Sequence, residues 1–117
     1  MDPHMSQTLD SLNRRFGQAG TLHFSDHGAG WPVAEITMPQ ASARIALQGA
    51  QLLAWQPAGQ SPVLWLSKAA VYAPGQAVRG GVPVCWPWFG AREGLPAHGL
   101  VRTRLCCLLY TSDAADE

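Results

Sequence analysis

The sequence lacks an excess of charge of either sign, because its eight Lys and Arg residues balance its eight Asp and Glu residues. A chain without net charge offers no global field that would favour nucleic acid or an anionic membrane. There is also no apolar run long enough to span a bilayer, and the first residues, MDPHM, lack the basic start and apolar middle of a secretory signal. We therefore expect a cytoplasmic protein that binds neither nucleic acid nor membrane, in which any bound anion is held by local geometry.

Cysteine is scarce as well, with three residues at Cys85, Cys106 and Cys107. An odd number with two adjacent members makes neither a disulfide framework nor a spaced set of metal ligands, so we expect free thiols and no metal. A phosphate-binding loop, a nucleophile elbow and a dinucleotide fingerprint are also missing. What remains is arginine, histidine and aromatic chemistry, which suits anion recognition and proton transfer.

The hydrophobic pattern of the 117 residues predicts one domain that begins with a helix and continues as short strands. Leu9, Leu12 and Phe16 recur at helical spacing, and Gly17 is a plausible stop, which predicts a helix over residues 6–16. Short apolar runs separated by turn residues then predict strands at residues 32–38, 43–47, 51–55, 63–66 and 69–72. Many short strands at close spacing indicate an all-β sandwich or barrel.

Residues 79–102, RGGVPVCWPWFGAREGLPAHGLVR, carry the side chains with the most chemical potential. Arg79 precedes two glycines, which allow a positive φ and a close approach of the backbone to a ligand. His98 can move a proton near neutral pH, and Arg102 follows four residues later. If residues 99–104 form a strand, Arg102 and Arg104 share one face. Pro83 and Pro87 lack N–H groups, so residues 82–88 are expected at a sheet edge or as a crossing segment.

Each of these residues also has a plain structural interpretation. Arg79 could be a solvated arginine beside a tight turn, and His98 could be a structural histidine. Trp86 and Trp88 could pack in the core or form a wall against which a sugar ring stacks. Glu93 is expected to be a solvated loop residue. Three further histidines are expected on the surface: His4, His23 and His27.

Three segments resemble the glucose-6-phosphate 1-epimerase family, the hexose-6-phosphate mutarotases of the galactose-mutarotase-like group. These are ALQGAQLLAWQPAGQSPVLWLS at residues 46–67, AVRGGVPVCWPWFG at residues 77–90 and LPAHGLVRTR at residues 95–104. The similarity covers roughly residues 41–103. Leu100 and Val101 stand where phenylalanine and alanine are common in the family.

The resemblance implies a galactose-mutarotase-like antiparallel β-sandwich, of which this chain is the N-terminal part. It implies an isomerase that interconverts the α and β anomers of hexose 6-phosphates without a cofactor, as a monomer in the full-length form. Arg79 and Arg102 are implied to contact the substrate, and His98 to line the sugar pocket. Non-catalytic binding of a sugar phosphate is the alternative function, and a purely structural β-domain is a third possibility.

The sequence also departs from the family. The proton-transferring histidine and glutamate are implied to come from an HTYF-like word and from a later segment, and the chain contains neither. After Arg104 it reads LCCLLYTSDAADE, where the family continues with a tryptophan-bearing strand. We therefore expect residues 1–104 to form the domain and residues 105–117 to be a non-native or frame-shifted tail. No catalytic residue is assigned beyond His98 as a candidate, and we expect apolar surface to be exposed toward the C-terminal end.

Overall fold

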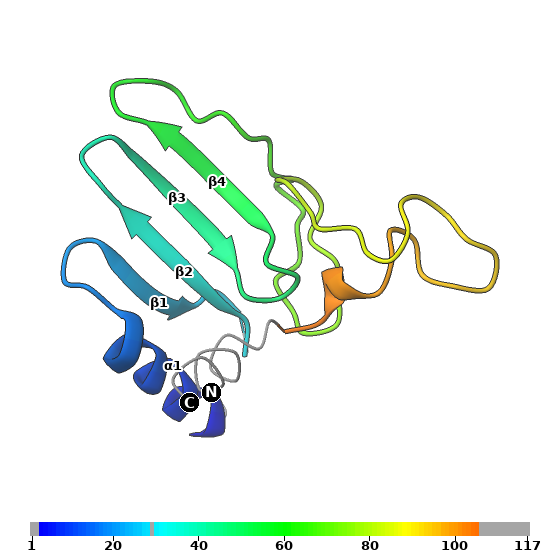
Figure 1. Cartoon of the computed structure of the whole chain (residues 1–117), viewed down its shortest axis with the longest axis horizontal. Coiled ribbons are helices and arrows are strands. Elements are labelled where there is room, and N and C mark those ends of the chain that lie inside the picture. The colour runs from blue at the N-terminus through cyan, green and yellow to red at the C-terminus, as the bar shows by residue number, and fades with distance from the viewer. Residues whose placement is uncertain (1–2, 29, 106–117) are drawn as a thin grey trace.

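The computed structural model describes residues 3–28 and 30–105. Within them, a helix precedes four strands and a single turn of 3₁₀-helix. The bounds are Pro3–Phe16 for α1, Leu22–Asp26 for β1, Pro32–Thr37 for β2, Ala41–Ala46 for β3, Leu52–Pro57 for β4 and Val101–Thr103 for η1. The strands pair antiparallel in the order β1-β2-β3-β4 (Figure 1). The predicted all-β class with a short N-terminal helix is therefore confirmed.

Helix α1 forms where the sequence predicts it and begins three residues earlier. Leu9 and Leu12 are buried and pack with Phe24, Ala34 and Leu47 in one hydrophobic cluster. Their helical spacing gives α1 a single apolar stripe, and burial of that stripe against β1 and β2 fixes the helix on one face of the sheet. The helix ends with the amide of Gly17 donating to the carbonyl of Asn13 at 2.9 Å.

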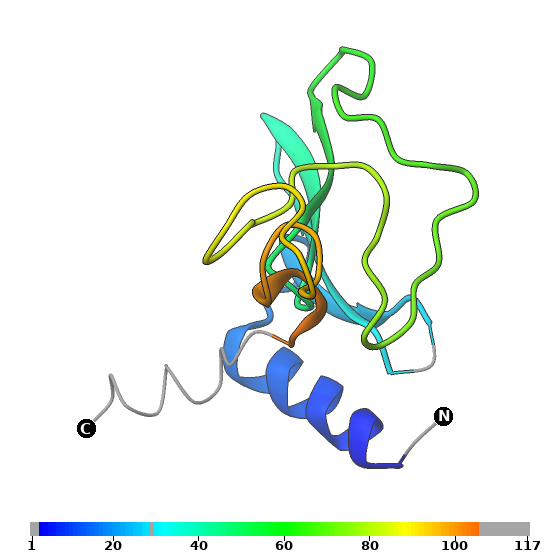
Figure 2. The same cartoon turned by 90° about the vertical axis from the view of Figure 1, so that its right-hand side faces the viewer.

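The opposite face of the sheet carries a second hydrophobic cluster. Successive side chains of a strand point to opposite faces, so Val33 lies on the other side from Ala34. Its cluster consists of Trp31, Val33, Ala46, Leu53 and Val78, with Leu66, Ala70 and Tyr72 packed against them. The segment from residue 58 to residue 80 therefore covers this face. Figure 2 shows that segment on one side of the sheet and the segment from residue 82 to residue 100 on the other.

Several sequence predictions about strands are wrong. Residues 63–66 and 69–72 form no strand, because they have only isolated contacts such as the Leu66–Gly80 bridge instead of a continuous partner. Residues 99–104 form η1 and its flanks, so Arg102 and Arg104 do not alternate along an extended strand. Strand β1 is an addition to the prediction. Its signal is the apolar pair Leu22 and Phe24 on the face that α1 covers.

Large apolar side chains are exposed in the second half of the chain, as the sequence predicts. Trp86 is 63% exposed and Phe89 83% exposed, so neither is shielded by the sheet or by α1. Further exposed apolar residues in this half are Val63, Trp65, Val71, Val82, Val84, Leu95 and Leu105. Burial is concentrated on the two faces of the sheet, and the segment from residue 82 to residue 100 contributes little to it. Of the predicted tail at residues 105–117, residues 106–117, with Cys106 and Cys107, lie outside the described residues.

Candidate functional site

Two buried glutamines tie the segment that carries Arg79 to the sheet. The Nε2 group of Gln51 donates to the carbonyls of Val78 at 3.1 Å and Gly80 at 2.6 Å. Gln48 donates from Nε2 to the carbonyl of Gln76 at 2.8 Å and accepts from the amide of Gly75 at 3.0 Å. These bonds hold the backbone on both sides of Arg79, while the side chain of Arg79 is exposed.

Sequence reasoning missed Gln48 and Gln51 as residues that position the candidate site. Both are at most 5% exposed although they are polar, and a buried amide needs hydrogen-bond partners. The available signal was two glutamines, separated by Gly49 and Ala50, at the end of an apolar strand. Glutamines in such a position can be solvated in a turn or can form hydrogen bonds with the backbone of a distant segment. In the structure, both form hydrogen bonds with the backbone of residues 75–80.

The two glycines after Arg79 serve a close approach, but to the protein's own backbone. Gly80 and Gly81 have φ values of +119° and +67°. A Cβ atom at Gly81 would lie 2.2 Å from the carbonyl oxygen of Leu52, and one at Gly80 would lie 2.6 Å from the Cα atom of Leu66. The predicted positive φ is confirmed, and the glycines allow this segment to pass between β4 and residues 65–66.

His98 lies in the loop between Trp86 and Leu100, next to the point where contacts between these two residues bring residues 77–90 and 95–104 together. The carbonyl of Trp86 accepts a hydrogen bond from the amide of Leu100 at 2.7 Å, and Trp86 and Gly99 form a parallel bridge. His98 itself has a φ of +63°. Its amide donates to the carbonyl of Gly90 at 2.8 Å, and its Nδ1 atom accepts from the amide of Gly90 at 3.0 Å. The half-buried imidazole is thus held by the backbone of its own loop.

The two tryptophans of the loop lie outside the two hydrophobic clusters. Trp86 is largely exposed, whereas Trp88 is half-buried and donates from Nε1 to the carbonyl of Pro96 at 3.0 Å. The guanidinium of Arg92 lies 5.1 Å from the centre of the Trp88 ring, a cation–π arrangement. Glu93, in the same loop, is exposed as expected. The interpretation of the tryptophan pair as core residues is therefore wrong, and a role as a stacking surface stays a prediction.

Arg102 lies in η1 against the turn between β3 and β4. Gly49 has a φ of +70°, and a Cβ atom there would lie 2.8 Å from the Cα atom of Arg102. The Nε atom of Arg102 is buried and has no hydrogen-bond partner among the described residues. A buried N–H of a guanidinium without an acceptor is costly, so this atom is the strongest local indication of an anionic ligand.

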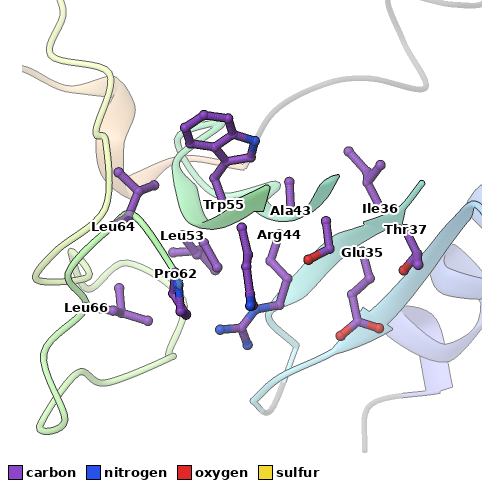
Figure 3. Close-up of a pocket in the computed structure, with 13 residues that line it drawn as sticks. Glu35, Ile36, Thr37, Ala43, Arg44, Leu53, Trp55, Pro62, Leu64 and Leu66 are labelled. Atoms are coloured by element: carbon purple, nitrogen blue, oxygen red, sulfur yellow. The ribbon is translucent and has the colours of Figure 1, made fainter. Parts of the chain in front are cut away.

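Within residues 3–28 and 30–105, no hydrogen bond or ion pair connects the side chains of Arg79, His98 and Arg102. Nor do the three line the pocket of about 500 Å³ that lies over β2, β3 and β4 (Figure 3). That pocket is walled by the sheet and by Pro62, Leu64 and Leu66.

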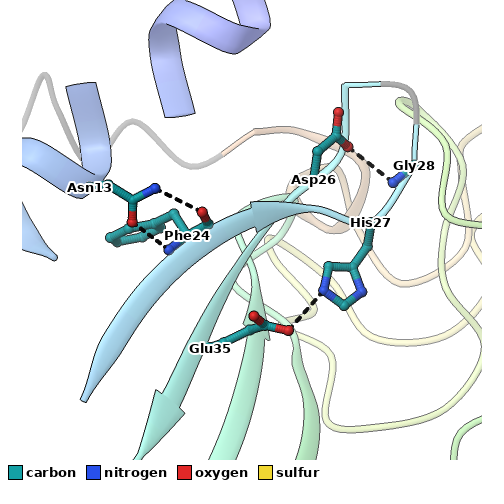
Figure 4. A network of polar contacts seen from close by, with 6 residues as sticks. All are labelled: Asn13, Phe24, Asp26, His27, Gly28 and Glu35. Atoms are coloured by element: carbon teal, nitrogen blue, oxygen red, sulfur yellow. Dashed lines mark hydrogen bonds and ion pairs between the residues drawn. The ribbon is translucent and has the colours of Figure 1, made fainter. Parts of the chain in front are cut away.

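Polar side chains of both signs line the sheet side of this pocket. Glu35 and Arg44 are cross-strand partners, yet Glu35 contacts His27, with Nε2 to Oε1 at 3.1 Å (Figures 3 and 4). His23 is exposed as predicted, but the side chain of His27 is only 24% exposed and is more than a surface residue. The side chain of His4 lies outside the described residues.

Asp26 organises the turn between β1 and β2. Its carboxylate accepts hydrogen bonds from the amides of Gly28 at 3.0 Å, Gly30 at 3.1 Å and Trp31 at 2.9 Å (Figure 4 shows the first). Burial alone would raise the pKa of Asp26, but these three bonds and the nearby charge of His27 together lower it below its usual value. Asp26 is therefore a structural carboxylate that stays ionised, not a proton donor.

No group of three His, Cys, Asp or Glu side chains in residues 3–28 and 30–105 is arranged to hold a metal ion. In the same part of the chain, no helix is both long and apolar enough to cross a membrane. Cys85, the cysteine within these residues, has a free thiol.

The sequence profile of the aldose 1-epimerase family matches residues 32–110, more than half of the chain. The chain belongs to the aldose 1-epimerase family. The match includes β2, β3 and β4 and the segments that carry Arg79, His98 and Arg102. The predicted family relationship is confirmed.

Individual proteins are similar to more than half of the chain. A protein of Escherichia coli named "Putative glucose-6-phosphate 1-epimerase" is 62% identical over 66 residues, which are 55% of this chain and 22% of that protein. A Salmonella typhimurium protein with the same name is 58% identical over 66 residues. The crystal structure of a "putative mutarotase (YeaD)" from Salmonella typhimurium superposes with a TM-score of 0.67 at 44% identity, covering 73% of this chain and 29% of that one.

The chain spans about a fifth of the length of the curated relatives that it matches. The similarity to the solved mutarotase shows that the four-stranded sheet belongs to the mutarotase fold of this family.

Proposed function

We propose that this chain carries substrate-binding residues of an enzyme that interconverts the α and β anomers of hexose 6-phosphates, with glucose 6-phosphate as the first substrate to test. The observation that carries the proposal is the 62% identity to a protein named as a glucose-6-phosphate 1-epimerase, within a chain of the aldose 1-epimerase family. Residues 77–90 and 95–104 support it, because they carry Arg79, His98 and Arg102 and are joined by the hydrogen bond from the amide of Leu100 to the carbonyl of Trp86.

We assign the phosphate contacts to Arg79 and Arg102. A sugar phosphate carries about 1.5 to 2 negative charges near pH 7, and guanidinium groups bind phosphate oxygens with two parallel hydrogen bonds. Arg79 presents an exposed side chain on a backbone fixed by Gln51, and Arg102 has a buried Nε–H without an acceptor among the described residues. The phosphate is remote from the reacting carbon, so its binding orients the sugar ring for the reaction.

Anomer exchange requires two proton transfers. A base removes the proton of the anomeric hydroxyl while an acid protonates the ring oxygen, the ring opens, and the carbonyl closes again from its other face. Each positioned proton transfer contributes a factor of about 10²–10⁴ in rate. Our assignment places substrate contacts on this chain and no complete acid–base pair, because Glu93, the carboxylate nearest to His98 in the sequence, is exposed.

Calorimetric titration and polarimetry together test this proposal. We expect saturable binding of glucose 6-phosphate, weaker binding of glucose, and no mutarotation of glucose 6-phosphate above the spontaneous rate. Clear catalysis would contradict the assignment of an incomplete acid–base pair. Equal binding of glucose and glucose 6-phosphate would contradict the phosphate contacts.

A non-catalytic sugar-phosphate binding module is the second candidate. It needs Arg79, His98 and Arg102 and no further proton-transfer residues, which agrees with the residues that the structure describes. The two candidates differ in what happens when the remaining part of a family member is supplied. Recovery of mutarotation on joining residues 1–104 to the corresponding later segment of the Escherichia coli relative supports the enzyme, whereas binding without recovery supports the module.

A further inference from the structure

Gly90 and His98 are linked by two hydrogen bonds that run in opposite directions. The backbone amide of His98 donates to the carbonyl of Gly90 at 2.8 Å. The backbone amide of Gly90 donates in return to the Nδ1 atom of His98 at 3.0 Å. We call this pair of bonds the Gly90–His98 clamp.

The second bond of the clamp determines which nitrogen of the imidazole carries a proton. A backbone N–H can only donate, so the Nδ1 atom must offer its lone pair to Gly90. A neutral imidazole holds one proton on one of its two nitrogens. In a neutral ring this bond favours the proton on Nε2, because a proton on Nδ1 would bring two donors face to face.

The surrounding backbone keeps the ring in this orientation. His98 has a φ of +63°, and the following Gly99 packs so closely that a Cβ atom there would lie 2.2 Å from the carbonyl oxygen of Trp86. The ring of Phe89 lies 5.0 Å from the imidazole, centre to centre. The Nε2 atom has no hydrogen-bond partner among the described residues.

We propose that Gly90 fixes His98 as the neutral Nε2–H tautomer, so that His98 presents a hydrogen-bond donor and not a proton acceptor to a sugar oxygen. The identity of the ligand rests on the proposed function, whereas the tautomer rests on the clamp alone. Gly90 acts here as a positioning residue through its backbone. The base that removes the anomeric proton must consequently be a group other than His98.

Nitrogen NMR of the imidazole tests the tautomer directly. With ¹⁵N-labelled histidine in the whole chain, no sugar present and the pH at about 8.5, where an imidazole is ordinarily neutral, we expect a protonated, pyrrole-type Nε2 and an unprotonated, pyridine-type Nδ1 for His98. A protonated Nδ1 or an exchanging mixture of both tautomers would overturn the proposal. If this signature is found and glucose 6-phosphate does not bind, the proposed function fails and the tautomer assignment stands.

Two substitutions separate the clamp from the donor. His98→Asn keeps an acceptor oxygen near the position of Nδ1, tolerates the positive φ, and removes the Nε2–H group. We expect it to retain slow hydrogen exchange at the Gly90 amide and to bind glucose 6-phosphate roughly tenfold more weakly, the effect of one lost hydrogen bond. His98→Ala should lose both, and His23→Asn on β1 should change neither. Unchanged affinity of His98→Asn would overturn the donor role.

Discussion

At the scale of single residues, Asp26 is the side chain whose negative charge is most clearly stabilised by the fold. Burial would raise its pKa, but the amides of Trp31, Gly28 and Gly30 together with the charge of His27 hold it below the usual value. A carboxyl with a lowered pKa in the folded state stabilises the protein above its unfolded pKa of about 3.9. That stabilisation is lost as the pH falls through the lower pKa of the folded state.

The substitution Asp26→Asn tests this charge. The amide oxygen can still accept from the turn, but the charge-assisted part of the three hydrogen bonds is gone. We expect the variant to unfold at lower urea concentration than wild type at pH 7, and the two midpoints to converge as the pH falls below about 4. A constant difference in midpoint from pH 7 into the acid range would show that the ionised form of Asp26 does not stabilise the fold.

The residues of the candidate site show what the sequence could and could not predict at this scale. Arg79, His98 and Arg102 stand out by residue type, because two guanidinium groups and an imidazole occur in one glycine-rich run. The sequence predicts that Gly80 and Gly81 allow a positive φ and a close approach to a ligand, but the groups that they approach, Leu52 and Leu66, belong to distant segments of the protein itself. Contacts between distant segments of this kind cannot be predicted from the residues around each glycine.

At the scale of elements, α1 depends on more than its apolar stripe. The side chain of Asn13 donates from Nδ2 to the carbonyl of Phe24 at 2.9 Å and accepts from the amide of Phe24 at 2.7 Å (Figure 4). β1 is the outer strand of the sheet, and its backbone groups would otherwise lack a partner on that side. Asn13 thus takes the place of a neighbouring strand at one residue of this edge.

Replacing Asn13 therefore detaches α1 from the edge of β1. We expect Asn13→Leu to lower the free energy of unfolding by about 1–3 kcal/mol, because two partly buried backbone groups lose their partners. Asn13→Asp keeps the acceptor and loses the donor, so its effect should be smaller. The measurement is urea unfolding, with the exposed Arg14→Ala on the same helix as control. Equal midpoints for Asn13→Leu and the control would contradict this account.

The elements were predictable where local pattern and long-range pairing agree. Helix α1 and strands β2, β3 and β4 have clear periodicity and adjacent partners in an antiparallel order. Residues 63–72 have the composition of a strand. In the structure, Leu66 and Ala70 pack against the cluster around Trp31, but this segment does not pair with a neighbouring strand. Residues 99–104 do not take the extended form considered for them, for a related reason. Two amides of this segment, those of Leu100 and Val101, turn toward the carbonyl of Trp86.

At the scale of the whole molecule, the sheet and α1 leave large apolar side chains uncovered. Phe89, Trp65 and Trp86 are 83%, 65% and 63% exposed. Exposed aromatic side chains in this number favour self-association and binding of hydrophobic dyes. We expect the isolated chain to enhance the fluorescence of anilinonaphthalene sulfonate and to associate as its concentration rises. A monomer with a sharp cooperative thermal transition and no dye binding would contradict this expectation.

The class of fold and the family were both accessible from the sequence, since both depend on patterns that extend over many residues. The mutual placement of Arg79, His98 and Arg102 was not. It depends on how residues 58–80, which carry Arg79, and residues 82–100, which carry His98, pack on opposite sides of one sheet (Figure 2), and on the packing of Arg102 against Gly49. Those segments have little regular structure, so their course is decided by individual bonds such as those of Gln51 and Gly90.

The most direct test of the central claim, that two arginines of this chain hold a phosphorylated sugar, is ³¹P NMR of glucose 6-phosphate titrated with the protein. We predict a saturable shift of the phosphate resonance with wild type, and affinity about ten- to a hundredfold weaker for Arg79→Ala and for Arg102→Ala, the loss of a charge-assisted contact. Arg14→Ala should titrate like wild type. A phosphate resonance that does not move, or that moves equally with all four proteins, would contradict the claim.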